Sequence, residues 1–193
     1  MENHTTKKIM NKIILTLVSA LVFTSCNVEK NYTENGTLES KGRISNNLKN
    51  GEWKMYHENG KLFQVGDYLD GKETGEWKFY HENGELHQYG AFKNGKQDGE
   101  WHFIHPNGVQ QGIGTLDEGK RIGVWKWYFD NGQLQTERSW NNGKLVEIIN
   151  YYDGQGNMLD KGSVTNGNGV MKTYDIDGKP FQELIYKDGE IVK

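Results

Sequence analysis

A block of 24 residues recurs along this chain, and its period constrains the fold more than any other feature. The first two complete copies read GEWKMYHENGKLFQVGDYLDGKET and GEWKFYHENGELHQYGAFKNGKQD. Periods of 20–50 residues are typical of stacked repeats, in which one unit is too small to bury its own apolar face. The sequence therefore predicts an array of about six to seven units over residues 32–193, with less regular units at its two ends.

Each unit carries two turn signals. The first is Asn-Gly, a strong signal for a hairpin, because type I′ turns need a positive φ at both central residues. The second is a glycine preceded by Asp, Asn or Glu, as at Asp70-Gly71. Two turns leave two strands of about 8–10 residues per unit, which pair antiparallel. The predicted fold is all-β: an array of antiparallel hairpins forming an elongated, curved, open single-layer sheet, preceded by a short N-terminal leader helix.

A tryptophan faces a glycine across the Asn-Gly turn in each of the first three complete units. This register follows if Asn and Gly are the two loop residues of the hairpin. A tryptophan that lies over a strand glycine covers exposed backbone and supplies the packing that glycine lacks. We therefore interpret these residues as structural and as defining the repeat. The pairs are Trp53 with Gly66, Trp77 with Gly90, and Trp101 with Gly114.

Later units change both members of the pair. In the fourth unit Trp125 faces Arg138, which can stack on the indole. In the last unit Met171 faces Leu184. Side chains alternate along a strand, so the tryptophans share an aromatic face with the Met or Phe two residues later. Lys54 and its equivalents then lie on the opposite, polar face.

Histidines recur just before the Asn-Gly turn, at His57, His81 and His105. A column of imidazoles is one interpretation, but a packing position is the simpler one, because Phe129 takes this place in the fourth unit. His87 and His102 are directly opposed on the polar face if Asn94-Gly95 closes their hairpin. Two histidines without a carboxylate or thiolate are too few for a metal site, so we expect neither a metal nor a cofactor.

The N-terminus differs from the repeats. Three lysines precede an apolar run over residues 13–23, which is too short to span a bilayer but suits the core of a signal peptide. Thr24 and Ser25 then lead to Cys26, the one cysteine of the chain. This order resembles the lipobox of bacterial lipoproteins, which implies cleavage after Ser25 and attachment of lipid to Cys26.

The lipobox resemblance divides the chain into three parts. Residues 1–25 are then a lipoprotein signal peptide, residues 26–31 a short polar tether, and residues 32–193 the repeat domain. The implied location is the cell envelope, where the lipid on Cys26 holds the protein to a membrane that faces the periplasm or the exterior. Ordinary secretion with an unmodified cysteine is the alternative, and Met10 is a second possible start.

The charge balance argues against nucleic acid as a partner. The chain has 23 basic and 26 acidic residues, of which the leader holds three and one, so 20 and 25 remain and the net charge is −5. No basic patch is interleaved with aromatic residues. We also find no phosphate-binding loop, nucleophile elbow or carboxylate pair in an apolar setting, and therefore predict that the protein is not an enzyme.

The unit G-x-W-x-x-Y-x-x-N-G-x-L-x-x-x-G resembles the bacterial variant of the MORN repeat and is similar to proteins of the YwqK family of antitoxins. The resemblance covers about residues 32–193. It implies a hairpin array used for protein interaction, scaffolding or organisation next to a membrane, and it implies no catalytic activity. Beside the tryptophans and glycines, the residues that carry it are Tyr56, Tyr80 and Tyr128.

Three functions remain open at this point. The first is a lipid-anchored repeat protein that presents a curved β surface to an unidentified protein partner outside the cytoplasm. The second is an antitoxin or immunity-type protein, which a toxin-like reading frame beside the gene would favour. The third is a carbohydrate-binding module that uses the tryptophan stripe, which requires flat, exposed indole rings.

Overall fold

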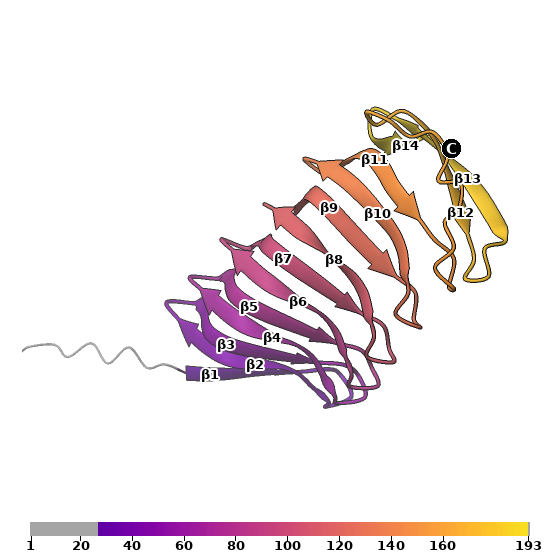
Figure 1. Ribbon diagram of the computed structural model, residues 1–193. Coiled ribbons are helices and arrows are strands. Elements are labelled where there is room, and N and C mark those ends of the chain that lie inside the picture. The colour runs from indigo at the N-terminus through magenta and orange to yellow at the C-terminus, as the bar shows by residue number, and fades with distance from the viewer. Residues whose placement is uncertain (1–26, 193) are drawn as a thin grey trace, which may run out of the picture.

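The computed structural model describes residues 27–192, and this part of the chain is all-β, with fourteen strands and no helix (Figure 1). Eleven strands form one open sheet in which every neighbour in space is the neighbour in sequence, and three form a second sheet. The predicted array of consecutive antiparallel hairpins is therefore confirmed. The predicted leader helix, signal peptide and lipidated cysteine lie outside the described residues.

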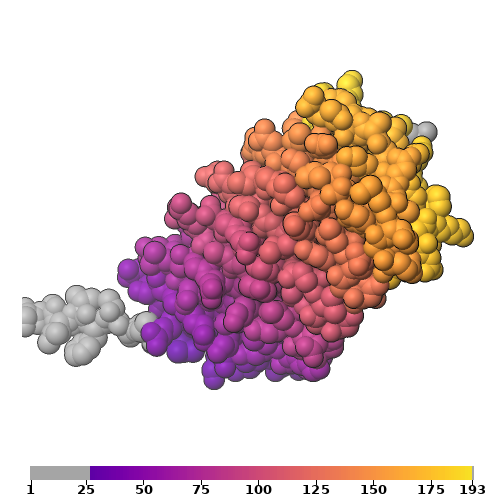
Figure 2. Space-filling view, in the orientation of Figure 1, coloured from indigo at the N-terminus to yellow at the C-terminus, as the bar shows by residue number. Residues whose placement is uncertain are grey.

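The strands follow one another along the array, as the colour gradient in Figure 2 also shows. The first sheet comprises β1 (Asn27–Tyr32), β2 (Leu38–Ser45), β3 (Leu48–Tyr56), β4 (Leu62–Leu69), β5 (Lys72–Tyr80), β6 (Leu86–Lys93), β7 (Lys96–Ile104), β8 (Gln110–Asp117), β9 (Lys120–Tyr128), β10 (Leu134–Asn141) and β11 (Lys144–Tyr151). The second comprises β12 (Gly169–Tyr174), β13 (Pro180–Lys187) and β14 (Glu190–Ile191).

The sheet begins earlier than the sequence suggested. Residues 27–31, expected to belong to a tether, lie in β1, which pairs with β2 from Asn27 opposite Ile44 onward. The correction has a simple cause, because these residues are one more copy of the repeat strand. Glu29 pairs with Gly42 as Trp53 pairs with Gly66 in the next unit. A charged residue at the tryptophan position of an edge strand discourages further pairing, as the end unit of an array requires.

The sheet is interrupted once, after β11. The unit in which β11 ends, residues 147–168, is two residues shorter than the complete units and has Ile149 at the tryptophan position. Residues 152–168 form three isolated bridges rather than a strand, among them Gly162 with Met171. The array then resumes as the three-stranded sheet. The single continuous meander expected from the sequence is thus divided in two where the repeat itself is shortened.

The two turn signals produce two different turns. Asp70 and Gly71 have φ values of 49° and 79°, as a type I′ turn requires. At Asn59-Gly60 only Gly60 has a positive φ, of 80°, and the His57 amide bonds the Lys61 carbonyl. This is a three-residue loop with a bulge, so the predicted type I′ turn at Asn-Gly is wrong. The bulge restores the register, since Trp53 still pairs with Gly66.

The glycine that opens each unit marks a second bulge. Gly75 has a φ of 66°, and the pairing of β4 with β5 shifts by two residues at this point. Because the pairing register shifts by two residues, every side chain stays on the same face of the sheet, but each residue gains a different cross-strand partner. As a result Trp77 lies beside two glycines, Gly66 in β4 and Gly90 in β6.

The indole ring covers the glycine of the preceding unit, which corrects the contact that we expected. A Cβ atom on Gly66 would lie 2.2 Å from the ring of Trp77, and one on Gly90 would meet the ring of Trp101. The cross-strand pairing of Trp77 with Gly90 is as predicted. The ring nevertheless leans toward the glycine eleven residues before it, because the bulge turns it that way.

Apolar side chains gather in three buried clusters along the aromatic face. Two are built on tryptophan rings, around Trp53 and Trp77 and around Trp101 and Trp125. The third joins the end of the long sheet to the short one and contains Leu145, Ile148, Tyr151, Val164, Met171 and Tyr186. The C-terminal sheet is therefore fixed to the array by a core and not by the chain alone.

Candidate functional site

The four repeat tryptophans are structural. Trp53, Trp77, Trp101 and Trp125 have at most 1% of their surface exposed. Each indole Nε1–H donates a hydrogen bond to a backbone carbonyl of the preceding unit, at Arg43, Asp67, Ala91 and Thr115, over 3.0–3.2 Å. A sugar cannot stack on a ring that is fully covered. The structure therefore argues against a carbohydrate-binding module that uses this stripe.

Arginine lies over Trp125, but not the arginine that we expected. Arg138 pairs with Trp125 across the strands, whereas the cation above the indole is Arg121, with Cζ 5.0 Å from the ring centroid. Arg138 stands where earlier units have the glycine beneath the next tryptophan. It pairs with Ile148 of β11, and because no indole follows, a long side chain fits there.

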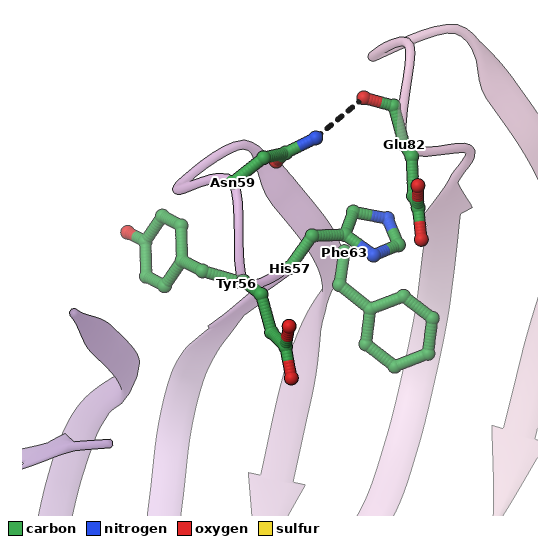
Figure 3. A pocket seen from close by; sticks show the side chains of 6 residues that line it. Tyr56, His57, Asn59, Phe63 and Glu82 are labelled. Atoms are coloured by element: carbon green, nitrogen blue, oxygen red, sulfur yellow. Dashed lines mark hydrogen bonds between the residues drawn. The ribbon is translucent and has the colours of Figure 1, made fainter. Parts of the chain in front are cut away.

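The turn edge of the array is held by side chains that reach into the next unit (Figure 3). The Nε2 atoms of His57, His81 and His105 lie 2.9–3.2 Å from backbone carbonyls 23 residues later, so each Nε2 carries the proton. The Asn59 amide nitrogen donates to the Glu82 carbonyl, and its oxygen accepts from the Lys61 amide. The histidine column is therefore a stacking device and not a ligand set.

A hollow of about 510 Å³ lies at this edge between the first two complete units. Figure 3 shows Tyr56, His57 and Phe63 around it, with Glu82 from the next turn. His57 packs edge-on against Phe63, with centroids 4.9 Å apart. The Nε2 atom of His57 is already bonded to the Tyr80 carbonyl, so the hollow offers a polar and aromatic lining.

His87 and His102 are not opposed, which corrects the prediction. The two-residue bulge in β7 places His102 opposite Tyr89, and their rings stack with centroids 4.4 Å apart and 2° between planes. His87 lies instead beside His81, at 4.3 Å between centroids. Within the described residues, no three or more His, Cys, Asp or Glu side chains are grouped to hold a metal ion.

His87 gives the fold a pH-sensitive position. Burial lowers its pKa below the ordinary value, and the adjacent His81 ring lowers it further. The unfolded chain then takes up the proton first, so this contribution to stability is present above a pH of about 6.5 and is lost as the pH falls below it. We expect His87→Gln to flatten the fall in unfolding midpoint between about pH 7 and 5. Denaturant titrations of the wild type and of this variant, repeated across that pH range, measure the midpoints.

The polar face presents a continuous row of cross-strand neighbours across the sheet. It contains four lysines together with apolar, aromatic and polar residues, and these side chains are exposed or half-buried. The row, called here the polar-face row, runs Lys41, Lys54, Val65, Lys78, Tyr89, His102, Ile113, Lys126, Glu137 and Asn150. Its ion pairs are local, such as Lys54 with Glu52 at 2.9 Å.

Sequence reasoning missed the asparagine and histidine bonds between units and the position of Arg121. The asparagines were visible as turn residues, but their second bond depends on the three-residue loop. Arg121 stands 72 residues after Lys49, so the 24-residue period was the available signal. Lys49 also lies over an indole, with Nζ 4.4 Å from the Trp53 ring.

The repeats match a known family model. The model of the MORN repeat variant matches residues 49–70, 73–94 and 121–142. Each stretch contains one strand pair joined by an Asn-Gly turn, so these three units are of the MORN type. A comparison with curated proteins gives no match. The described residues include no helix that is long and apolar enough to cross a membrane.

Proposed function

We propose that the protein is a non-enzymatic scaffold, held at the cell envelope by lipid on Cys26, whose sheet binds a protein partner. One observation supports this most directly. The aromatic residues that would serve a ligand pocket are used to hold units together, while the polar face stays open over eleven strands. MORN-type repeats commonly bind proteins or membranes, and the polar-face row offers a partner spaced charges and apolar side chains.

Lipid attachment gives the first prediction of this proposal. We expect the mature protein to lack residues 1–25 and to carry a diacylated or triacylated Cys26. Intact mass spectrometry of the protein from a membrane fraction measures both features at once, and Cys26→Ser serves as the control that should become soluble. A mature chain that keeps Met1 or Met10 and an unmodified thiol would contradict the anchor.

Partner binding is tested on the polar face with charge-matched variants. One variant carries Lys54→Glu and Lys78→Glu in the polar-face row. The control carries Lys72→Glu and Lys93→Glu, which lie exposed next to the type I′ turns and change the net charge equally. Affinity capture from the membrane fraction, followed by mass spectrometry, should lose a partner with the first variant and keep it with the second.

Equal retention or equal loss by both variants would mean that the polar face is not the binding surface. The identity of the captured protein also separates the antitoxin alternative. A toxin whose activity is blocked by the wild type and not by the polar-face variant would favour an immunity role, still through the same surface.

A further inference from the structure

Arg121 is held in a box of three indole rings on the aromatic face. Its Cζ lies 5.0 Å from the centroid of Trp125, 5.4 Å from that of Trp127 and 5.0 Å from that of Trp140. A guanidinium that stacks on rings keeps the N–H groups at its edge available for hydrogen bonds. The three rings therefore orient the guanidinium of Arg121 without using its N–H groups.

Three buried nitrogen atoms in the same region have no hydrogen-bond partner. Among the described residues, the buried side-chain polar atoms that lack a partner are Nε1 of Trp127, Nε of Arg138 and Nε1 of Trp140. All three are N–H donors, and all belong to β9 or β10. The four repeat tryptophans, by contrast, all donate to carbonyls. The region is rich in donors and poor in acceptors.

The two arginines also lack an acid. Neither Arg121 nor Arg138 forms an ion pair within the described part of the chain. Burial lowers the pKa of both guanidinium groups, and Arg121 lowers that of Arg138 further. Burial raises the pKa of the Tyr186 hydroxyl, so this group stays neutral and supplies no counter-charge to the arginines. Buried positive charge without a counter-charge is unfavourable, and an anion would relieve it.

A hollow of about 300 Å³ opens beside Arg121. Its lining includes the apolar side chains of Phe103, Leu116 and Trp125 and the charged side chains of Lys120 and Arg121. Gln97 and the turn glycines Gly119 and Gly143 complete the lining, which contains no acidic residue. The adjacent Glu118 is engaged elsewhere, with its carboxylate 3.0 Å from Nζ of Lys96.

We propose that this hollow binds a carboxylate side chain of a partner protein, flanked by an apolar residue. The carboxylate would accept a forked pair of hydrogen bonds from Arg121 and a further bond from Lys120, while the apolar neighbour packs against the half-buried ring of Phe103. The inference rests on the proposed function and specifies its partner as an acidic, apolar segment. The site lies on the aromatic face, so it would give the partner a second contact, on the side of the sheet opposite the polar-face row.

Two peptides that differ in one group test the site. The probes are acetyl-Leu-Glu-Phe-amide and acetyl-Leu-Gln-Phe-amide, titrated into the full mature protein in detergent. The six indole N–H signals in nitrogen-correlated NMR spectra report binding, because Trp125, Trp127 and Trp140 surround Arg121. We expect the glutamate peptide to shift these signals and the glutamine peptide to bind at least about 10-fold more weakly.

Matched variants locate the binding. Arg121→Gln should weaken the glutamate peptide by about 10-fold or more. Lys49→Gln, at the same repeat position over another indole, should leave the affinity unchanged. Equal affinity for both peptides, no binding of either, or an equal effect of the two variants would overturn the site, and so would inorganic phosphate that binds as tightly as the peptide. This titration needs no natural partner, so a negative result would overturn the proposed carboxylate site alone. The proposed function would still be tested separately by the capture experiment.

Discussion

Trp77→Ala is expected to lower the free energy of unfolding by about 3–5 kcal/mol, the usual cost of removing a large buried aromatic side chain. The ring is 1% exposed, lies over Gly66, and packs against Tyr68 and Phe92 with centroids 5.2 and 5.6 Å away. Its Nε1–H bond to the Asp67 carbonyl is lost as well. Unfolding in denaturant, followed by fluorescence and circular dichroism, measures the change.

A double-mutant comparison shows which glycine the ring covers. Gly66→Ala places a Cβ within 2.2 Å of the Trp77 ring and should destabilise strongly alone, but much less when Trp77→Ala is already present. Gly90→Ala clashes with Trp101 and should combine with Trp77→Ala nearly additively. Coupling that is stronger with Gly90 than with Gly66 would show that the rings lean the other way. Because repeat arrays need not unfold in two states, midpoints of each transition are compared.

Met171→Ala should cost about 2–5 kcal/mol, since the side chain is fully buried in the cluster that joins the two sheets. The loss falls on one junction, so we expect the C-terminal sheet to separate from β11 before the long sheet unfolds. Hydrogen exchange of the β12 and β13 amides measures this local opening.

A second methionine in the same region serves as the control. Met158 is 70% exposed, and Met158→Ala should change stability by no more than about 0.5 kcal/mol. Faster exchange throughout the long sheet in Met171→Ala, with no difference between the two sheets, would show that the junction is not a separate unit of stability.

The fold was predictable because the period repeats every local signal. Asp70-Gly71 has the backbone of the predicted type I′ turn. The pairing of Trp53 with Gly66 was also correct. These features depend on residue types at fixed spacing, which the sequence displays directly.

Features that depend on bulges were not predictable. The bulge at Gly99 moved His102 away from His87 and toward Tyr89, and the equivalent bulges turned each indole toward the preceding glycine. A bulge changes the partner of a side chain without changing the alternation of polar and apolar residues, so that alternation does not reveal it. The glycine that opens each unit was the available signal. Arg121 was missed for a similar reason, because its ring contacts come from three different positions on two strands.

Each junction within the long sheet pairs one strand with the next strand along the chain, so the units are evenly spaced along the array. One unit adds two strands, which advance the sheet by roughly 10 Å at the ordinary spacing between strands. Lys54 and Lys78 are one unit apart and Lys126 lies two further on, so their charges fall at multiples of this step. The array would therefore favour a partner whose binding groups repeat with the same spacing and over the same length. Duplicating residues 75–98 would add one unit to the array without introducing a new kind of contact.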